Sequence, residues 1–235
     1  MKPNVVVLTG AGISAESGLK TFRDNDGLWE NHSIEDVATP EAFERDPNLV
    51  YRFYNERRAQ LLTGNVEANL AHIALAKLEA NLGDSFTLVT QNVDNLHEKG
   101  GSINVIHMHG ELLSARCSFS GKSVHYTGVL DGNSRCTCCH PANIMRPDIV
   151  WFGEMPKYMD YIYERLSAAD WFISIGTSGN VYPAAGFVEV AKSADAKTVE
   201  LNLEPSINCH HFDKQYSGRA TEIVPAFIHN TFLSE

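Results

Sequence analysis

Short apolar runs alternate along the chain with longer segments in which apolar residues recur at helical spacing. The apolar runs predict buried strands at residues 5–8, 86–90, 104–107, 171–175 and 198–203. The helical spacing predicts helices at residues 69–82, 158–168 and 183–193. Strands that alternate with helices are typical of a parallel sheet covered on both faces. We therefore expect an α/β fold built on a doubly wound parallel sheet.

The first predicted strand runs into a glycine-rich turn that is typical of dinucleotide-binding proteins. The turn consists of Gly10, Ala11, Gly12, Ile13, Ser14 and Ala15. When such a G-x-G-x-x-(G/A) turn opens a helix, the helix N-terminus faces the phosphates of the dinucleotide. A dehydrogenase would continue into a second buried strand that carries an acidic residue for the ribose. Residues 21–30 are instead polar and turn-rich, which favours a loop over the nucleotide and argues against hydride transfer.

Two segments do not fit the alternation of strands and helices. Residues 36–62 have a helical pattern, in which Thr39-Pro40-Glu41 supplies an N-cap, a first-position proline and an early acid. Residues 116–144 lack apolar periodicity and are rich in Cys, Gly and Ser. We therefore expect a single domain, residues 1–235, with two lobes. The large, Rossmann-like lobe comprises residues 1–30, 65–112 and 146–235, and the small lobe comprises a helical insertion at 31–64 and a Cys-rich insertion at 113–145.

Polar residues follow four of the predicted strands, at the edge where doubly wound sheets bind ligands. They are Gln91, Asn92 and Asp94 after the second strand, His107 and His109 at the third, a Gly-Thr-Ser-Gly turn at 176–179, and Asn202 and Glu204 at the last. Asn and Asp also cap helices, and either histidine can be a structural residue or a metal ligand. Four such strand ends together favour a nucleotide site, in which His109 is the better general base.

Composition narrows the class of protein. The chain has 235 residues, of which 43% are hydrophobic and 20% charged, as in an ordinary globular protein. Its net charge of −10, without a basic patch, argues against a nucleic-acid partner. The acidity either favours cationic partners such as Lys-rich segments or serves solubility alone. The first strand begins too near Met1 for a signal peptide, and no apolar run approaches the roughly 18 residues of a membrane span. We therefore expect a cytoplasmic protein with no membrane partner.

Six motifs span nearly the whole chain in the order found in one known family. They are GAGISAESG with the following TFR (10–23), TQNVDNLH (90–97), HMHGE (107–111), WFGE (151–154), GTSG (176–179) and NLEP (202–205). Together they resemble the sirtuin family, most closely its bacterial CobB-type members. The resemblance implies a Rossmann-like large domain, a small domain with a zinc module, and NAD-dependent removal of acyl groups from lysine segments of other proteins. It implies that the acyl oxygen attacks C1′ of the nicotinamide ribose, and that nicotinamide and O-acyl-ADP-ribose are released.

The resemblance also assigns roles to single residues. His109 matches the general base that activates a ribose hydroxyl, and Asn92 matches a residue that orients the ribose and water. Ile13 and Asp94 match the nicotinamide pocket, and Phe22 matches an aromatic that shields the reactive carbon. The other expected cofactor contacts are Gly10, Ala11, Gly12, Ser14, Ala15, Arg23, Trp29, Gln91, Val93, Gly176, Thr177, Ser178, Asn202, Leu203, Glu204 and Ala220.

A second pocket is expected for the acyl group. Tyr54 and Arg57 lie three residues apart in a helical pattern and so share one face. They match the Tyr-x-x-Arg pair by which some sirtuins bind the carboxylate of succinyl- or malonyl-lysine, and Ala38 matches a small residue that keeps that pocket open. A guanidinium binds a carboxylate bidentately, which suits this role, although Arg57 also fits a charged helix surface. We therefore expect desuccinylase activity alongside deacetylase activity.

The substrate peptide is expected to lie as an added strand between residues 150–153 and 179–181. The resemblance places Val150, Phe152 and Gly153 at one edge of this site. An apolar tunnel beside Trp151 and Phe152 would take the lysine stem, although at least one of these two aromatics can instead belong to the core.

Clustered cysteines in a cytosolic chain indicate a metal site more than disulfides. The family's zinc site uses two Cys-x-x-Cys pairs, and Cys117, Cys136 and Cys139 match three of the four positions. Ser120 occupies the fourth. Cys138, His125, His140 or water remain as possible fourth zinc ligands. Cys209 is interpreted as a core or surface thiol.

Two other functions remain open alongside the deacylase. A mono-ADP-ribosyltransferase shares the first step but needs no base on the bound ribose, so an intact His109 favours deacylation. A non-catalytic NAD-sensing module would be favoured by loss of Asn92, Asp94 or His109, and all three are present. The sequence does not indicate an oligomeric state.

Overall fold

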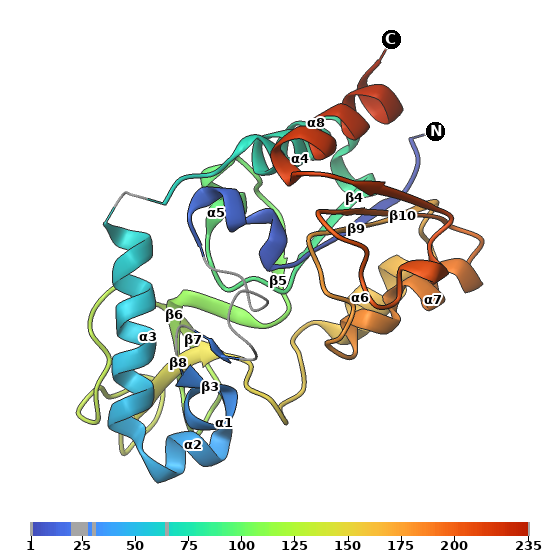
Figure 1. The fold of residues 1–235 in the computed structure, drawn as a ribbon. Coiled ribbons are helices and arrows are strands. Elements are labelled where there is room, and N and C mark those ends of the chain that lie inside the picture. Colours follow the sequence, from blue (N-terminus) through green and yellow to red (C-terminus); the bar gives the residue numbers. More distant parts are fainter. Residues whose placement is uncertain (1, 20–27, 30–31, 64–65, 235) are drawn as a thin grey trace.

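Six parallel strands form the central sheet of the computed structural model, which describes residues 2–19, 28–29, 32–63 and 66–234 (Figure 1). The strand order is β11 (Lys214–Ser217), β10 (Lys197–Asn202), β9 (Trp171–Ile175), β1 (Val5–Thr9), β4 (Phe86–Thr90) and β5 (Val105–His107). All neighbouring strands are parallel. The sheet grows outward from β1 through β4 to β5, and then from β9 in the opposite direction. This is the doubly wound arrangement, with its switch point between β1 and β9.

Helices cover both faces of this sheet. α4 (Leu70–Leu82) and α8 (Ala220–Ile228) pack on one face, and α6 (Met159–Ser167) and α7 (Phe187–Ser193) pack on the other (Figure 1). Side chains alternate along a strand, so Val5 and Val7 of β1 join one core cluster whereas Val6 and Leu8 join the other. The predicted α/β fold with a doubly wound parallel sheet is therefore confirmed.

Three helices and an antiparallel sheet lie together, apart from the central sheet (Figure 1). The helices are α1 (Ile34–Val37), α2 (Pro40–Arg45) and α3 (Pro47–Leu62), and the sheet order is β7 (Ser123–His125), β6 (Gly110–Cys117) and β8 (Met145–Ile149). A short pair, β2 (Leu28–Trp29) and β3 (His32–Ser33), is also antiparallel. Val37, Phe53 and Ile149 share one buried cluster, which joins the helices to the sheet. β6 begins at Gly110, so the lobe boundary expected at residue 112 falls within a strand.

The helical segment expected at 36–62 consists of three helices, the first of which begins at Ile34. Thr39 caps α2 as predicted, because its Oγ1 accepts a hydrogen bond from Ala42 N at 3.0 Å. Asp46 caps α3 in the same way, with its Oδ1 accepting from Leu49 N at 3.0 Å. Pro40 and Pro47 follow the two caps at the first helical positions. Proline lacks the N–H that a continuing helix needs, so each proline starts a new helix.

Several short or terminal elements have no counterpart among the predicted ones. β11 and α8 follow the last predicted strand, 198–203, and β11 adds one more strand to the sheet. The other short elements are α5 (Leu96–Lys99), a π-helical turn at His229–Leu233, and 3₁₀ turns at Ala11–Ile13, Ala15–Ser17, Gly83–Ser85, Ala184–Gly186 and Cys209–His211. Among the helices of the described ranges, none is both long and apolar enough to cross a membrane.

Candidate functional site

The glycine-rich turn after β1 meets a second glycine turn, after β9, at the switch point of the sheet. Gly10 N donates to Ile175 O at 2.9 Å, and Gly12 N donates to Gly176 O at 2.8 Å. A Cβ atom on Gly12 would lie 2.7 Å from Gly176 Cα, and one on Gly10 would lie 2.8 Å from Gly176 O. Only glycine lets two backbones approach this closely. The two turns therefore pack together at the position where doubly wound sheets bind nucleotides.

The first glycine turn does not open an α-helix, contrary to the expectation from its sequence. It continues as two 3₁₀ turns, and Gly18, with φ of +88°, ends the second of them in the left-handed region. The N–H groups of Ile13 and Ser14 bond within the turn, at 3.2 and 3.1 Å. The expected helix N-terminus facing the phosphates is therefore wrong. The polar groups at this edge of the sheet are instead supplied by side chains, of which Ser14 is the first along the chain.

Ser14 joins a buried network with two polar residues from the loop after β4. Asn92 Nδ2 donates to Ser14 Oγ at 3.1 Å, and Ser14 Oγ donates to Asp94 Oδ2 at 3.1 Å. Asp94 Oδ1 accepts from Leu96 N at 3.0 Å. Burial raises the pKa of Asp94, while the hydrogen bonds from Leu96 and Ser14 act in the opposite direction. The network fixes the Asn92 amide and the Asp94 carboxyl against the glycine turn.

His109 has one ring nitrogen held by the protein. Its Nδ1 lies 3.1 Å from Gln91 O. A carbonyl only accepts, so Nδ1 carries the proton and Nε2 keeps its lone pair. Burial lowers the pKa of His109, although the bond to Gln91 acts in the opposite direction. His109 is therefore a neutral imidazole near pH 7 with Nε2 as an acceptor, which is the state that a general base needs.

The ends of β9 and β10 carry the next expected cofactor residues. Asn202, 7% exposed, ends β10, and its Nδ2 donates to Thr177 O at 2.7 Å. Leu203, the next residue, is 66% exposed, and Glu204 beside it is also exposed. The remaining expected contacts lie at the same sheet edge: Ala11 and Ala15 after β1, Gln91 and Val93 after β4, and Ser178 after β9.

Ala220 begins α8 and comes close to the first glycine turn. Its neighbour Thr221 donates to the Glu16 carboxylate from Oγ1 at 2.8 Å and from the backbone N at 3.0 Å. Phe22 and Arg23 lie outside the described residues. Trp29 lies in β2, and its side chain lies outside what the structure describes.

Ala38 and Tyr54, two of the three residues expected to contact the acyl group, share one buried cluster. Ala38 and Tyr54 are 4% and 0% exposed, and Tyr54 Oη accepts a hydrogen bond from Trp151 Nε1 at 3.0 Å. Burial raises the pKa of Tyr54, so its hydroxyl keeps its proton. The Arg57 guanidinium carbon lies 4.1 Å from the centroid of the Phe53 ring. The same guanidinium donates to Phe53 O at 3.1 Å and to the neighbouring Glu56 carboxylate at 2.9 Å.

The segment expected to bind the substrate backbone begins after β8. Trp151 is 2% exposed and belongs to the core, whereas Phe152 is 45% exposed. The N–H groups of Val150 and Phe152 donate to His109 O and Ala38 O, at 2.8 and 2.9 Å. Gly153 follows with φ of +90°. This segment therefore links His109 to Ala38 through backbone hydrogen bonds.

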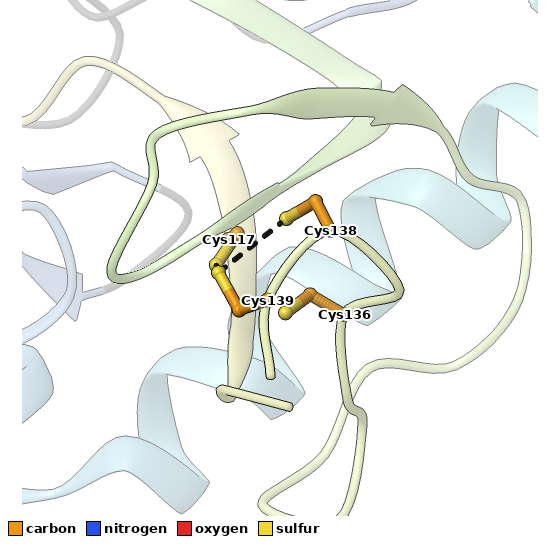
Figure 2. Close-up of side chains that lie close together, drawn as sticks. All are labelled: Cys117, Cys136, Cys138 and Cys139. Carbon is orange, nitrogen blue, oxygen red and sulfur yellow. Dashed lines mark hydrogen bonds between the residues drawn. The ribbon is translucent and has the colours of Figure 1, made fainter. Parts of the chain in front are cut away.

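Four cysteines form the candidate metal site (Figure 2). The sulfur atoms of Cys117, Cys136, Cys138 and Cys139 all lie within 4.8 Å of one another. The Sγ atoms of Cys117 and Cys139 are 3.7 Å apart, and those of Cys138 and Cys139 are 3.8 Å apart. Zn–S bonds of about 2.3 Å in a tetrahedron place sulfur atoms roughly 3.8 Å apart, so the cluster fits Zn²⁺.

Cys138 is the fourth member of this group, and neither His125 nor His140 belongs to it. The sequence left this position open because the Cys-x-x-Cys spacing singles out Cys136 and Cys139. Ser120, at the expected fourth position, lies with its Oγ 3.1 Å from Cys138 Sγ. Hydrogen bonds from Ser120 lower the pKa of Cys117 to about 6, which favours the thiolate that zinc requires.

Comparison with known proteins identifies the family of this chain. The Sir2 family model matches residues 10–183. The chain is 61% identical over 227 residues to NAD-dependent protein deacylases of Yersinia pestis and Escherichia coli (strain K12), covering 97% of this chain and 82% and 81% of theirs. It is 61% identical over 224 residues to the protein of the same name in Pasteurella multocida (strain Pm70), covering 95% of this chain and 96% of that one.

The solved structures that resemble this chain belong to the same family. A mutant Sir2 homologue in complex with ADP ribose matches with a TM-score of 0.86 and 37% identity, covering 96% of this chain and 90% of that one. A Sir2 homologue in complex with NAD matches with a TM-score of 0.85 and 37% identity, covering 96% and 88%. The family resemblance read from the six motifs is confirmed, and this chain belongs to the Sir2 family, the sirtuins.

Proposed function

We propose that this chain is an NAD-dependent protein-lysine deacylase that releases nicotinamide and O-acyl-ADP-ribose. The observation that carries the proposal is the state of His109, which is neutral, with its Nδ1 bonded to Gln91 O. Asn92 and Asp94, which Ser14 joins in a buried network, lie on the same loop as that carbonyl. The names of the relatives, at 61% identity over most of the chain, support the same activity. An enzyme that only transfers ADP-ribose to another acceptor has no need of such a base.

The chain's own residues have separable tasks in this reaction. Bound NAD supplies the ribose carbon that the acyl oxygen attacks, with nicotinamide as the leaving group. Asn92, fixed through Ser14, orients the ribose, and Asp94 and Ile13 form the nicotinamide pocket. His109 Nε2 takes a proton from a ribose hydroxyl, because Nδ1 already bears the one proton of the neutral ring. The burial of Asn92 and Asp94 limits the access of water to this loop.

The acyl pocket extends the substrate range to acyl groups that end in a carboxylate. Tyr54 and Arg57 lie on one face of α3, and Ala38 and Trp151 share the buried cluster of Tyr54. On binding succinyl-lysine, Arg57 exchanges its exposed contact with Glu56 for the acyl carboxylate, and the Tyr54 hydroxyl adds a hydrogen bond. Acetyl-lysine makes neither contact, so deacetylation proceeds without them.

The substrate peptide lies along residues 150–153, facing residues 179–181. The N–H groups of Val150 and Phe152 are bonded within the chain, so the peptide's own N–H groups donate to carbonyls of this segment.

The four cysteines hold one structural Zn²⁺, which cross-links the loops around β6 and β8. The chain forms a large and a small lobe with the boundaries given above, except that the small lobe takes the whole of β6 from Gly110. The protein acts in the cytoplasm.

The proposal is tested by mass spectrometry of acetyl- and succinyl-lysine peptides incubated with the protein, with and without NAD. We expect NAD-dependent loss of both acyl groups, and loss of both activities in His109→Ala. Arg57→Ala should weaken succinyl removal and spare acetyl removal. The matched control is Arg52→Ala, which removes an exposed arginine from the same helix and should spare both. Consumption of NAD with the acyl group untouched would overturn the proposal in favour of ADP-ribosyl transfer, and no reaction would favour a binding module.

A further inference from the structure

Three consecutive carbonyls tie the loop after β4 to the end of β5. Thr90 O accepts from Met108 N at 3.1 Å. Gln91 O and Asn92 O lie 3.1 and 3.3 Å from the Nδ1 atoms of His109 and His107, respectively. Two histidines that are two residues apart therefore hold neighbouring peptide groups of one loop. That loop also carries the Asn92 side chain.

The two histidines differ in what surrounds their second nitrogen. His107 Nε2 lies 2.8 Å from Glu98 Oε1, on α5. Both nitrogens of His107 therefore face oxygen atoms that only accept hydrogen bonds. A neutral imidazole has one N–H, and would leave a nitrogen lone pair against an oxygen lone pair. Only the imidazolium satisfies both contacts, whereas the single Nδ1 contact of His109 is satisfied by the neutral ring.

The charged groups around His107 agree with this assignment. Burial alone would lower the pKa of His107, but the hydrogen bond and negative charge of Glu98 raise it. Glu111, at the start of β6, and the Asn92 carbonyl raise it further, and the net shift is upward. The Asp94 carboxyl faces the same ring, and His97 of α5 is a second, neutral imidazole nearby. The side chain of His107 is 6% exposed and that of Glu98 is 41% exposed, so solvent screens their interaction in part.

We propose that His107, held as an imidazolium by Glu98, is a positioning residue that fixes the Asn92 peptide and through it the orientation of Asn92 and His109. The inference rests on the proposed deacylase function for its kinetic consequence, but the charge state of His107 stands independently of it. A neutral His107 would repel one of its two oxygen neighbours. The loop would then shift, and the hydrogen bonds that hold Asn92 to Ser14 and His109 to Gln91 would loosen.

The charge state is tested by two-bond ¹H–¹⁵N spectra of the full chain labelled at histidine nitrogens, with His107→Gln used to assign the signals. We expect His107 to be an imidazolium and His109 a neutral Nδ1–H tautomer at pH 7. In Glu98→Gln, which keeps an acceptor but removes the charge, His107 should titrate about one pH unit or more lower. Glu111→Gln, which removes a nearby charge without a hydrogen bond to the ring, should shift it less. A neutral His107 in the wild-type chain at pH 7 would overturn the inference, whether or not the chain is a deacylase.

The positioning role is tested by steady-state kinetics with an acetyl-lysine peptide. His107→Leu should lower kcat by roughly tenfold, with the KM for the peptide little changed, because misplaced groups slow chemistry more than binding. His107→Gln keeps one donor and should recover part of that loss. In Glu98→Gln, the alkaline limb of the kcat profile should move to lower pH. A merely structural role predicts a loss of kcat in proportion to unfolded protein and an unmoved pH profile, and that result would refute the positioning role.

Discussion

Trp151 donates its indole N–H to the hydroxyl of Tyr54 at 3.0 Å, and both side chains are almost fully buried. The Arg146 guanidinium stacks on the Trp151 ring, with its carbon 3.3 Å from the ring centroid. Glu154 bonds Arg146 at 2.8 and 2.9 Å. A chain of contacts from α3 to the segment after β8 therefore shapes the proposed acyl pocket, which does not depend on Tyr54 and Arg57 alone.

Replacing Tyr54 with Phe should affect both stability and acyl preference. The substitution leaves the buried Trp151 N–H without this acceptor, so the free energy of unfolding should fall by about 1–2 kcal/mol. Loss of one hydrogen bond to a carboxylate should lower kcat/KM for succinyl-lysine roughly tenfold more than for acetyl-lysine. Urea unfolding and kinetics on both peptides measure the two effects.

Tyr51→Phe is the matched control on the same helix. Tyr51 donates to Met145 O at 2.7 Å in a different buried cluster, so this variant also loses a buried hydrogen bond. It should lower stability without changing the ratio of the two acyl activities. An equal decline of both activities in Tyr54→Phe would contradict the assigned role of its hydroxyl.

Cys138→Ser should weaken metal binding by at least roughly tenfold, because it removes one of four thiolates. Replacement of zinc by Co²⁺ gives the readout, since its absorption reports the number of thiolate ligands. Cys209→Ser removes a thiol outside the cluster and should leave the cobalt spectrum unchanged. A Cys138→Ser spectrum identical to that of the wild type would show that the fourth ligand is another group.

Gly12→Ala should destabilise the fold by about 1–3 kcal/mol, because its Cβ would lie 2.7 Å from Gly176 Cα. The backbone of both turns would have to move apart at the switch point, so NAD binding should also weaken. Gly132→Ala is the matched control, because its Cβ would meet nothing within 4 Å and its φ is not in the left-handed region. Thermal unfolding and calorimetric titration with NAD compare the two variants, and equal behaviour would argue against the packed glycine turns.

The sequence predicts the centre of the fold better than its edges, for identifiable physical reasons. Residues 86–90 and 171–175 are mostly apolar runs, and both strands have the predicted bounds. β11 has four exposed residues and no apolar run, so its sequence carries no strand signal. α8 contains Pro225, which a sequence pattern reads as a helix breaker.

The contacts that a side chain makes are harder to predict from the sequence than the element on which that side chain lies. The six motifs identify the strand ends on which Asn92, Asp94 and His109 lie, because turn chemistry and strand pattern are local. The contact between His107 and Glu98 depends on how α5 folds back beside β5, which no spacing rule encodes. Cys138 joins the metal site for a similar reason, since the turn from Cys136 to Cys139 brings all three sulfur atoms together.

Acid should destabilise the protein through His72, which is 0% exposed at the start of α4. Its Nδ1 accepts from Asn69 N at 3.2 Å, and burial lowers the pKa of His72 to about 4. Between pH 6.5, the ordinary value, and about 4 the unfolded chain binds a proton that the folded chain does not. The stabilisation is therefore complete above pH 6.5 and is lost as the pH falls towards 4, by roughly 3 kcal/mol at most.

His97 contributes with the same sign, because burial and the neighbouring His72 and His107 lower its pKa well below the ordinary value. Urea unfolding of wild type and His72→Gln at several pH values between 7 and 4 measures the effect. The variant should be less stable at pH 7, because it alters the capping contact of α4, but its stability should fall less steeply with acid. Parallel curves for the two proteins would show that His72 is protonated as easily in the folded chain as in the unfolded one.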